Sequence, residues 1–231
     1  MPVHGGELHL RAGLRDQLTR PQQAKIAVLE GGKARWLRSG FGHEGCIIAS
    51  VPITSYRDKL LDSLRAHAPI DATEAGHLAS ILAFVAAQSA PFSRNTLDGH
   101  ITASAFIVDP THLFTLLVWH EKLARWLQPG GHCEESDEST LAAAVREIEE
   151  ETGLDSSQLK QVGVGVFDVD AHRIPARRDV PEHWHYDIRY LFEADRAAPT
   201  QAGANWVSIE QMLAHPHASL RRLAERAANA G

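Results

Sequence analysis

Three glutamates in one short segment could hold a divalent cation. Glu147, Glu150 and Glu151 are three and four positions apart, so on a helix they project from one face. Three carboxylates placed this closely repel one another, and the negative end of the helix dipole adds to the cost. A hard cation such as Mg²⁺ or Mn²⁺ between them would offset the repulsion. The guanidinium of Arg146 could hold one carboxylate in place.

The flanking residues predict that this segment is a helix between two loops. Ser139 is typical of the residue that caps a helix N-terminus, and Gly153 can adopt the left-handed conformation that ends a helix. A solvated acidic face is the alternative interpretation of the glutamates taken alone. On a helical wheel the apolar side chains form one stripe, which we expect to be buried: Leu141, Ala144, Val145 and Ile148.

The spacing of these residues resembles the Nudix box, over Gly131 to Leu154. That box consists of glycine, five residues, glutamate, seven residues, Arg-Glu, an aliphatic residue, any residue, Glu-Glu, any residue, glycine and an aliphatic residue. The loop before Glu138 holds one extra residue, which leaves open whether the carbonyl of Gly130 or of Gly131 would face a metal. Eight residues keep the family spacing: Glu138, Arg146, Glu147, Ile148, Glu150, Glu151, Gly153 and Leu154.

The resemblance implies a mechanism and a set of roles. Nudix hydrolases cleave a diphosphate linked to another group, usually with Mg²⁺, by attack of water on phosphorus. The resemblance implies that Glu138 and Gly153 are structural residues of the motif. It leaves the general base open between a box glutamate and a later carboxylate. It implies that the catalytic and metal-binding residues are Arg146, Glu147, Glu150 and Glu151, with Gly131 as a backbone metal ligand.

Three functions are compatible with this resemblance. The first is a Mg²⁺- or Mn²⁺-dependent pyrophosphohydrolase acting on an ADP-ribose-like compound, a nucleotide sugar or a nucleoside triphosphate. The second is isoprenoid diphosphate chemistry on the same fold, as in an isomerase that needs a specific cysteine and departs from the full box. The third is a nucleotide-sensing regulatory module, which usually lacks box glutamates. The intact pair of Glu150 and Glu151 favours hydrolysis.

A second group of polar residues follows the box. Asp168, Asp170 and His172 alternate along the chain, and so do His183, His185 and Asp187, so each set would share one face of a strand. Hydrogen-bonded or solvent-facing strand residues are the alternative, and a second metal site stays open. Phosphate could bind to the intervening arginines 173, 177 and 178. We expect substrate to contact Asp170, His172, Arg173, His183, His185 and Asp187.

The remaining elements predict a fold of mixed helices and strands. Two helices are expected first. One runs over 56–67 with Ser55 as its N-cap, and the other begins at a cap on Thr73 and ends before Pro91. A hairpin around Asp109-Pro110, over 101–108 and 113–119, comes next. Further strands are expected at 125–127, 162–169 and 185–192, and a helix at 209–214. The expected fold is α+β, the mixed-sheet α/β/α sandwich of the Nudix family, over residues 94–231 after a helical segment at 51–93.

The first fifty residues have a different character. They contain eight of the chain's seventeen glycines, which break any sustained hydrophobic period. Residues 24–29 could form a short strand. We interpret residues 1–50 as a poorly defined, loosely ordered extension, and the alternative is a small β-rich appendage that covers a dimer surface.

Composition narrows the possible partners. The chain has 231 residues and a net charge of −6, which argues against binding to a nucleic acid polymer and favours a small diphosphate substrate. Two cysteines are too few for a disulfide framework or a cysteine-based zinc site. No long apolar run or signal peptide is present, so we expect a cytoplasmic protein without membrane contacts. The resemblance also implies a possible homodimer, which light scattering can measure.

Overall fold

The structure is a computed structural model that describes residues 25–30, 33–38, 55–177 and 180–230. The chain divides into two units, Met1–Pro52 and Ile53–Gly231. In the first unit, β1 (Lys25–Glu30) and β2 (Lys33–Arg38) form an antiparallel two-stranded sheet. β1 covers the strand expected at 24–29. The rest of the expected extension, and Arg178 of the basic run, lie outside the described residues.

The second unit is built on a mixed sheet. Its central strands, β3 (Gly99–Val108) and β9 (His183–Glu193), run parallel and pair from Gly99 opposite Trp184 to Val108 opposite Glu193. The strand order is β10-β4-β3-β9-β7, and three further strands pair antiparallel with β4, β3 and β9. The remaining bounds are β4 (Phe114–His120), β5 (Arg125–Leu127), β6 (Gly130–His132), β7 (Lys160–Gln161), β8 (Asp168–Ile174) and β10 (Ala204–Ser208).

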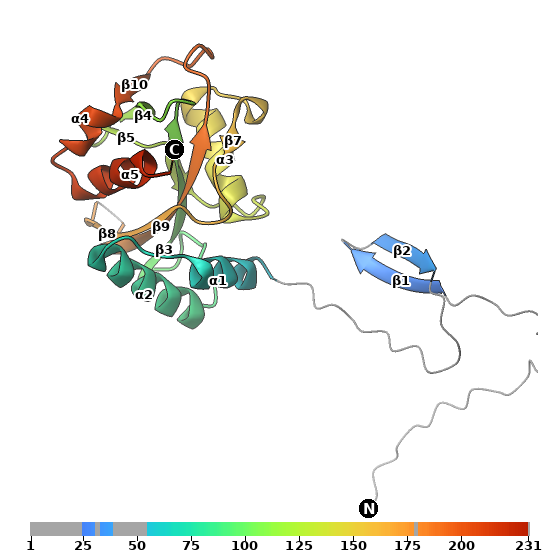
Figure 1. The fold of residues 1–231 in the computed structure, drawn as a ribbon. Coiled ribbons are helices and arrows are strands. Elements are labelled where there is room, and N and C mark those ends of the chain that lie inside the picture. Colours follow the sequence, from blue (N-terminus) through green and yellow to red (C-terminus); the bar gives the residue numbers. More distant parts are fainter. Residues whose placement is uncertain (1–24, 31–32, 39–54, 178–179, 231) are drawn as a thin grey trace, which may run out of the picture. The chain divides into compact units, whose positions relative to one another are not determined.

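Helices cover both faces of this sheet. In Figure 1 the yellow helix α3 and the red helices α4 and α5 lie on opposite sides of the strands β3 and β9. A 3₁₀ turn (Ser156–Gln158) follows α3. None of the helices in the described part of the chain is long and apolar enough to cross a membrane. The helix bounds are α1 (Tyr56–Ala66), α2 (Ala72–Ala87), α3 (Thr140–Thr152), α4 (Ile209–Leu213) and α5 (Ala218–Ala228).

Alternation along β3 divides the core in two. Ile101 and Ala103 belong to the hydrophobic cluster that includes side chains of α1, α2 and α3. Phe106 and Val108 belong to a second cluster with side chains of α4 and α5. Because successive side chains of a strand point to opposite faces, this arrangement confirms the α/β/α sandwich. At the His100 end of β3 the second face carries polar residues instead, and the candidate site residues lie there.

Several predicted elements differ from the observed ones. The expected strand over 162–169 is wrong, because Gly163 and Gly165 have positive φ of 76° and 92° and β8 begins only at Asp168. The cap of α2 is Asp71, whose carboxylate accepts from the Glu74 N–H, and not Thr73. The hairpin at Asp109-Pro110 is confirmed. β3 pairs with β4 only at Ile107 and Val108, and its residues 102–104 pair with β6 instead.

A buried glutamate ties α2 to its neighbours. The Glu74 carboxylate is fully buried, lies 2.7 Å from Nε2 of His67 and accepts from the Ile70 N–H. Arg226 of α5 donates to the same carboxylate at 3.0 Å. Burial raises the pKa of Glu74, but the His67 hydrogen bond, the Ile70 N–H and the charge of Arg226 outweigh it, and the net pKa is lowered. These contacts join α1, α2 and α5.

Replacing this carboxylate should destabilise the domain. In Glu74→Gln the partly buried guanidinium of Arg226 loses its counter-charge, so we expect the free energy of unfolding, measured by urea denaturation, to fall by about 3 kcal/mol. The exposed Glu225→Gln is the control and should change it by less than about 0.5 kcal/mol. Because the folded-state pKa is lowered, this contribution is present above the unfolded-state value and is lost as pH falls below it. Equal stabilities of the two variants at pH 7 would contradict the prediction.

Candidate active site

The helix α3 presents the box glutamates as predicted. The Ser139 side chain accepts from the Ala142 N–H, and Gly153 ends the helix with φ of 75°. Ala144 and Ile148 are fully buried. Leu141 and Val145, partly buried, pack against the same hydrophobic cluster. The apolar stripe therefore fixes the rotation of α3 and turns its glutamates toward β6.

Two of the glutamates converge on the paired glycines of β6. The N–H of Gly130 donates to Oε2 of Glu151 at 2.9 Å. A methyl group on Gly131 would lie 2.7 Å from the carboxyl carbon of Glu147, and one on Gly130 would lie 2.6 Å from Cα of Ser104. Neither contact is sterically possible without a shift. Gly130 is therefore required by its close approach to the backbone of β3, whereas a side chain at Gly131 would displace the Glu147 carboxylate.

Arg146 joins the box helix to the preceding loop and to β6. Its guanidinium donates to Oε1 of Glu147 at 3.0 Å and to Oε1 of Glu150 at 3.3 Å. It also donates to the His132 carbonyl at 2.8 Å and, through two nitrogens, to the Asp137 carboxylate at 3.0 and 3.2 Å. The planar guanidinium has several N–H donors and can therefore bind these groups at the same time. Arg146 therefore holds the carboxylates of Glu147 and Glu150 in place.

Asp137 is the loop carboxylate that binds Arg146. Glu138 is exposed, whereas Asp137 is largely buried between Arg146 and the Glu134 N–H. Burial raises the pKa of Asp137, but the Arg146 hydrogen bond outweighs it and the net pKa is lowered. Five residues separate Asp137 from Gly131, as in the family pattern, so counting forward from the glycine finds the acid that binds Arg146. The extra residue of the loop then follows this acid instead of preceding it.

The carboxylate cluster fits a hard divalent cation. Burial raises the pKa of Glu147 and of Glu151, and the charge of the neighbouring Glu150 acts in the same direction. The donors are carboxylate oxygens beside the backbone oxygens of β6, which is the ligand chemistry that Mg²⁺ and Mn²⁺ prefer. The residues that would hold the ion are Glu147, Glu150 and Glu151, with a carbonyl of Gly130 or Gly131.

The second predicted group lies on one face of β8 and β9. Asp170 pairs with Asp187 and His172 with His185 across the two antiparallel strands. Parallel pairing with β3 then places His100 opposite His185. The structure therefore brings the predicted histidines and aspartates together, although they share the face with residues that the sequence did not single out.

Asp170 and Asp187 of this group are engaged by buried arginines. Asp187 accepts from Nε of Arg189 at 2.8 Å and from the hydroxyls of Thr102 and Ser104. Asp170 lies 3.1 Å from Arg222 of α5 and 3.4 Å from Arg189. Burial raises the pKa of Asp170, but Arg189 and hydrogen bonds from His172 and His77 hold it well below its usual range. The Asp170 carboxylate is therefore ionised, and both carboxylates are engaged by protein partners.

Histidine rings continue the polar face beyond the aspartates. The rings of His100 and His132 are 4.8 Å apart, and each lies about 5 Å from the ring of His185, at 4.8 and 5.1 Å. Burial lowers the pKa of His100 and of His132 to about 4 and that of His185 to about 2, with neighbouring positive charge adding to the effect. These rings are neutral at physiological pH.

A cavity of about 410 Å³ borders the histidines. Its lining includes His183, Trp184 and the exposed side chain of Arg173. The Arg173 guanidinium lies 5.3 Å from the centre of the Trp184 ring and 2.7 Å from the carboxylate of Glu182. A cation beside an aromatic ring at a cavity wall can bind an anionic group and stack a planar one.

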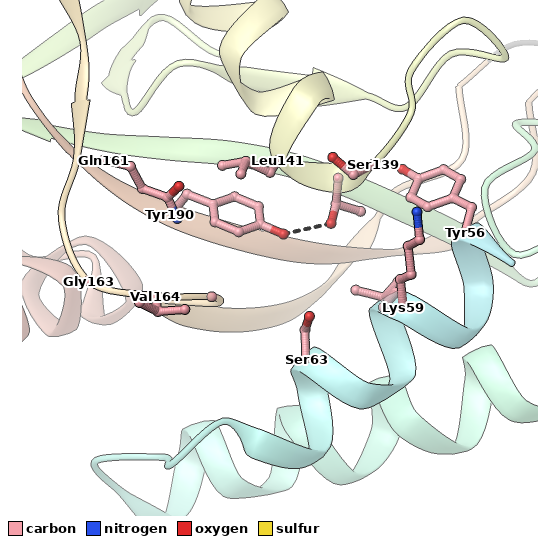
Figure 2. Close-up of a pocket in the computed structure, with 12 residues that line it drawn as sticks. Tyr56, Lys59, Ser63, Ser139, Leu141, Gln161, Gly163, Val164 and Tyr190 are labelled. Carbon is pink, nitrogen blue, oxygen red and sulfur yellow. Dashed lines mark hydrogen bonds between the residues drawn. The ribbon is translucent and has the colours of Figure 1, made fainter. Parts of the chain in front are cut away.

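A second cavity, of about 340 Å³, lies at the start of α3. Figure 2 shows Tyr56, Lys59 and Ser63 of α1 on one side of it and Tyr190 on the other. The Tyr190 hydroxyl is 2.7 Å from Oγ1 of Thr140. None of the box glutamates lines this cavity, so we place the candidate active site at β6 and not here.

Five residues of the site region were not found from the sequence. His100 and Arg189 stand within runs that look like ordinary strands, and Arg222 stands in a helix that was not expected. His132 lies inside the box loop, where the family pattern specifies no residue type, and Asp137 takes the position of the family's glutamate only when the pattern is counted forward from Gly131. Polar alternation at His100, Thr102 and Ser104 was the available signal for the first of them.

Comparison with known proteins identifies the family. A family model described as NUDIX domain matches residues 98–226, more than half of the chain. The chain therefore belongs to the NUDIX domain family. With its box glutamates intact it is a Nudix-type hydrolase, a pyrophosphohydrolase. A search of curated proteins finds no match.

Similar solved structures include three with related descriptions. A Caenorhabditis elegans Ap4A hydrolase complex is 17% identical with a TM-score of 0.44, covering 56% of this chain and 95% of that one. A NUDIX-family hydrolase from Clostridium perfringens is 25% identical with a TM-score of 0.42, covering 56% and 96%. The NUDIX domain of Shewanella oneidensis NrtR, cocrystallised with ADP ribose, is 21% identical with a TM-score of 0.42, covering 64% and 96%.

The close approach at Gly131 can be tested with a single methyl group. In Gly131→Ala the methyl displaces the Glu147 carboxylate, so we expect Mn²⁺ affinity measured by calorimetry to fall about tenfold. Stability should fall by about 1–3 kcal/mol. Gly76→Ala is the matched control, since Gly76 of α2 has open space around it, and it should gain about 0.4–1 kcal/mol with unchanged Mn²⁺ binding. Unchanged Mn²⁺ affinity in Gly131→Ala would contradict the prediction.

Proposed function

We propose that the chain is a Mg²⁺- or Mn²⁺-dependent pyrophosphohydrolase acting on a nucleoside diphosphate derivative. The candidate substrates are an ADP-ribose-like compound, a nucleotide sugar and a nucleoside triphosphate. One observation carries the proposal: the carboxylates of Glu147 and Glu151 converge on the paired glycines of β6, and Arg146 fixes Glu147 and Glu150 beside them.

The chain's own residues divide the work of the reaction. A divalent cation supplies charge neutralisation for the diphosphate and makes a bound water more acidic. Glu147, Glu150 and Glu151 would hold the cation, while Arg146 orients two of them from the side of the loop. The Gly130 N–H orients Glu151. This arrangement would keep the glutamates in position for the cation without rearrangement of the helix.

A box glutamate is the best candidate for the general base. The later carboxylates Asp170 and Asp187 are each bound by buried arginines and are poor proton acceptors. Glu150 has its side chain 57% exposed and accepts only one bond of 3.3 Å from Arg146 among the described residues. Of the three box glutamates it is therefore the least constrained by protein contacts, and a carboxylate oxygen that does not hold the cation would take the proton of the attacking water.

The cavity beside β9 is our proposed substrate site. Arg173 and His183 line it, and the rings of His172 and His185 lie next to it. Asp170 would act through His172, whose Nδ1 is 3.1 Å from its carboxylate, and Asp187 would position β3 through Thr102 and Ser104. His132 connects this region to the box, because its carbonyl accepts from Arg146 while its ring contacts His100.

The two alternative functions have less support. Isoprenoid isomerase chemistry needs a reactive cysteine. The single cysteine of the described residues is Cys133, and burial raises the pKa of its thiol to about 12. A purely regulatory module would not need the complete carboxylate cluster. Residence in the cytoplasm and a homodimer, both expected from the sequence, also belong to this proposal, and light scattering can measure the dimer.

Neutralising the metal ligands should abolish turnover. We expect Glu150→Gln and Glu151→Gln each to lower kcat by about 10²-fold or more, because each removes a charge from the cation site. Release of phosphate and mononucleotide would be measured over nucleotide sugars, dinucleoside polyphosphates, ADP-ribose and triphosphates, with Mg²⁺ or Mn²⁺. Glu149→Gln changes the same charge on an exposed position of α3 and should keep wild-type activity. Turnover that survives both changes or a chelator would refute the proposal.

Removing the cation at the cavity wall should weaken substrate binding. Arg173→Gln loses a charged contact to phosphate, so we expect KM for the best substrate to rise about tenfold with a smaller change in kcat. Arg65→Gln is the control, since Arg65 is an equally exposed arginine of α1 that forms only a local ion pair with Asp62. Steady-state kinetics measures both constants. The same KM in both variants would exclude Arg173 from the substrate site.

A further inference from the structure

Three imidazoles meet at one point on the polar face of the sheet. His100 comes from β3, and His183 and His185 come from β9. The register places His100 opposite His185, and His183 lies two residues earlier on the same face. One ring nitrogen from each residue lies within 4.8 Å of the others. The sheet itself therefore assembles three potential nitrogen ligands from two strands.

One nitrogen pair already has the separation of two ligands of one ion. Nε2 of His183 and Nε2 of His185 are 3.3 Å apart. Zinc–imidazole bonds of about 2.0–2.1 Å at a tetrahedral angle place two nitrogens about 3.3–3.4 Å apart. The third nitrogen, on His100, would reach the same ion after a small ring movement.

His100 has no partner that explains its burial. The residue is 3% exposed, and neither ring nitrogen has a hydrogen-bond partner among the described residues. Buried polar atoms are nearly always satisfied in native proteins, so an orphaned pair needs an explanation. A bound metal ion would satisfy one of these nitrogens.

Nδ1 of His183 has the kind of hydrogen-bond partner that histidine ligands of metals have. Nδ1 of His183 lies 2.9 Å from the Pro181 carbonyl, which requires the proton on Nδ1 and leaves the lone pair on Nε2. Ligand histidines commonly donate their second N–H to a carbonyl or carboxylate in this way. Nδ1 of the adjacent His172 is held similarly, 3.1 Å from the Asp170 carboxylate. The lone pair of His183 therefore points at the other imidazoles.

We propose that His100, His183 and His185 bind one transition-metal ion of the zinc type, at a site separate from the box glutamates. Imidazole nitrogen suits Zn²⁺, Co²⁺, Ni²⁺ or Cu²⁺ and is a poor ligand for Mg²⁺, whereas the carboxylate cluster has the opposite preference. Three protein ligands leave a coordination position for water or another small ligand. The neighbouring cavity, which His183 lines, gives the ion access.

Metal binding to the full-length chain tests this site directly. The protein is stripped with a chelator, supplied with excess Mg²⁺ to occupy the carboxylate cluster, and titrated with Zn²⁺ by calorimetry. Co²⁺ is the spectroscopic probe, because tetrahedral nitrogen ligation gives strong visible absorption. We expect an equivalent of Zn²⁺ that Mg²⁺ does not displace, with a matching Co²⁺ spectrum and a raised melting temperature.

Substitution of single residues identifies which side chains bind the Zn²⁺ ion. His183→Gln, at a half-buried position, should weaken Zn²⁺ binding at least tenfold and remove the Co²⁺ band, and His185→Gln should do the same. His120→Gln removes a half-buried histidine of β4 and should bind as wild type. Glu151→Gln should also keep the Zn²⁺ equivalent. Circular dichroism of the metal-free proteins checks that each variant folds.

Three results would overturn the proposal. These are a wild-type chain that binds no Zn²⁺, His183→Gln and His185→Gln variants that bind it as wild type does, and loss of Zn²⁺ in Glu151→Gln alone, which would place the ion at the box. None of these outcomes depends on turnover, so failure of the hydrolase assay and failure of the metal site are distinguishable.

Discussion

The parallel pairing of β3 with β9 is the constraint on which both parts of the candidate site depend. It sets Thr102 opposite Asp187 and His100 opposite His185 on one face, and Ala103 opposite Ile188 on the other. The apolar face packs against α1, α2 and α3 and so fixes the box helix. The polar face gathers the histidines. A shift of one residue between the strands would exchange these faces and separate both clusters, which is why the register must be maintained strongly.

Buried charge fixes how β8 and α5 align with β9. Arg189 of β9 donates to Asp187 on its own strand and to Asp168 on β8, and Arg222 brings α5 to Asp168 and Asp170. Charges removed from water are costly unless each one is paired and hydrogen-bonded. Only one alignment of β8, β9 and α5 pairs all of these groups. The network borders the histidines, because Asp170 binds both Arg222 of α5 and the ring of His172.

The predictable part of the molecule was the part with local signals. Ser139, the apolar stripe and Gly153 define α3 without reference to any distant residue, and the glutamate spacing follows from that helix. The sheet register is a long-range property, so the sequence could show that His183 and His185 share a face but could not place His100 beside them. Arg222 could not be predicted because its helix, α5, has no side-chain cap and few other sequence signals at its ends.

Asp137 shows a different limit of the sequence. Counted backward from Arg146, the family pattern places its loop acid at Glu138. Counted forward from Gly131, it places the acid at Asp137, and the difference is the one inserted residue. Geometry decides between them, because the carboxylate that reaches the guanidinium of Arg146 is the one turned inward by the Glu134 N–H. Sequence spacing alone carries no information about that turn.

The short strand β6 separates the carboxylate cluster from the histidine cluster. Gly131 faces Glu147 and the other carboxylates of α3, while the ring of the next residue, His132, faces His100 and His185 on the opposite side. Alternation along a strand guarantees this division, with oxygen ligands on one side and nitrogen ligands on the other. The extra residue of the box lies in the loop after β6 and leaves the division intact. An insertion within β6 would turn His132 toward the glutamates and break both clusters at once.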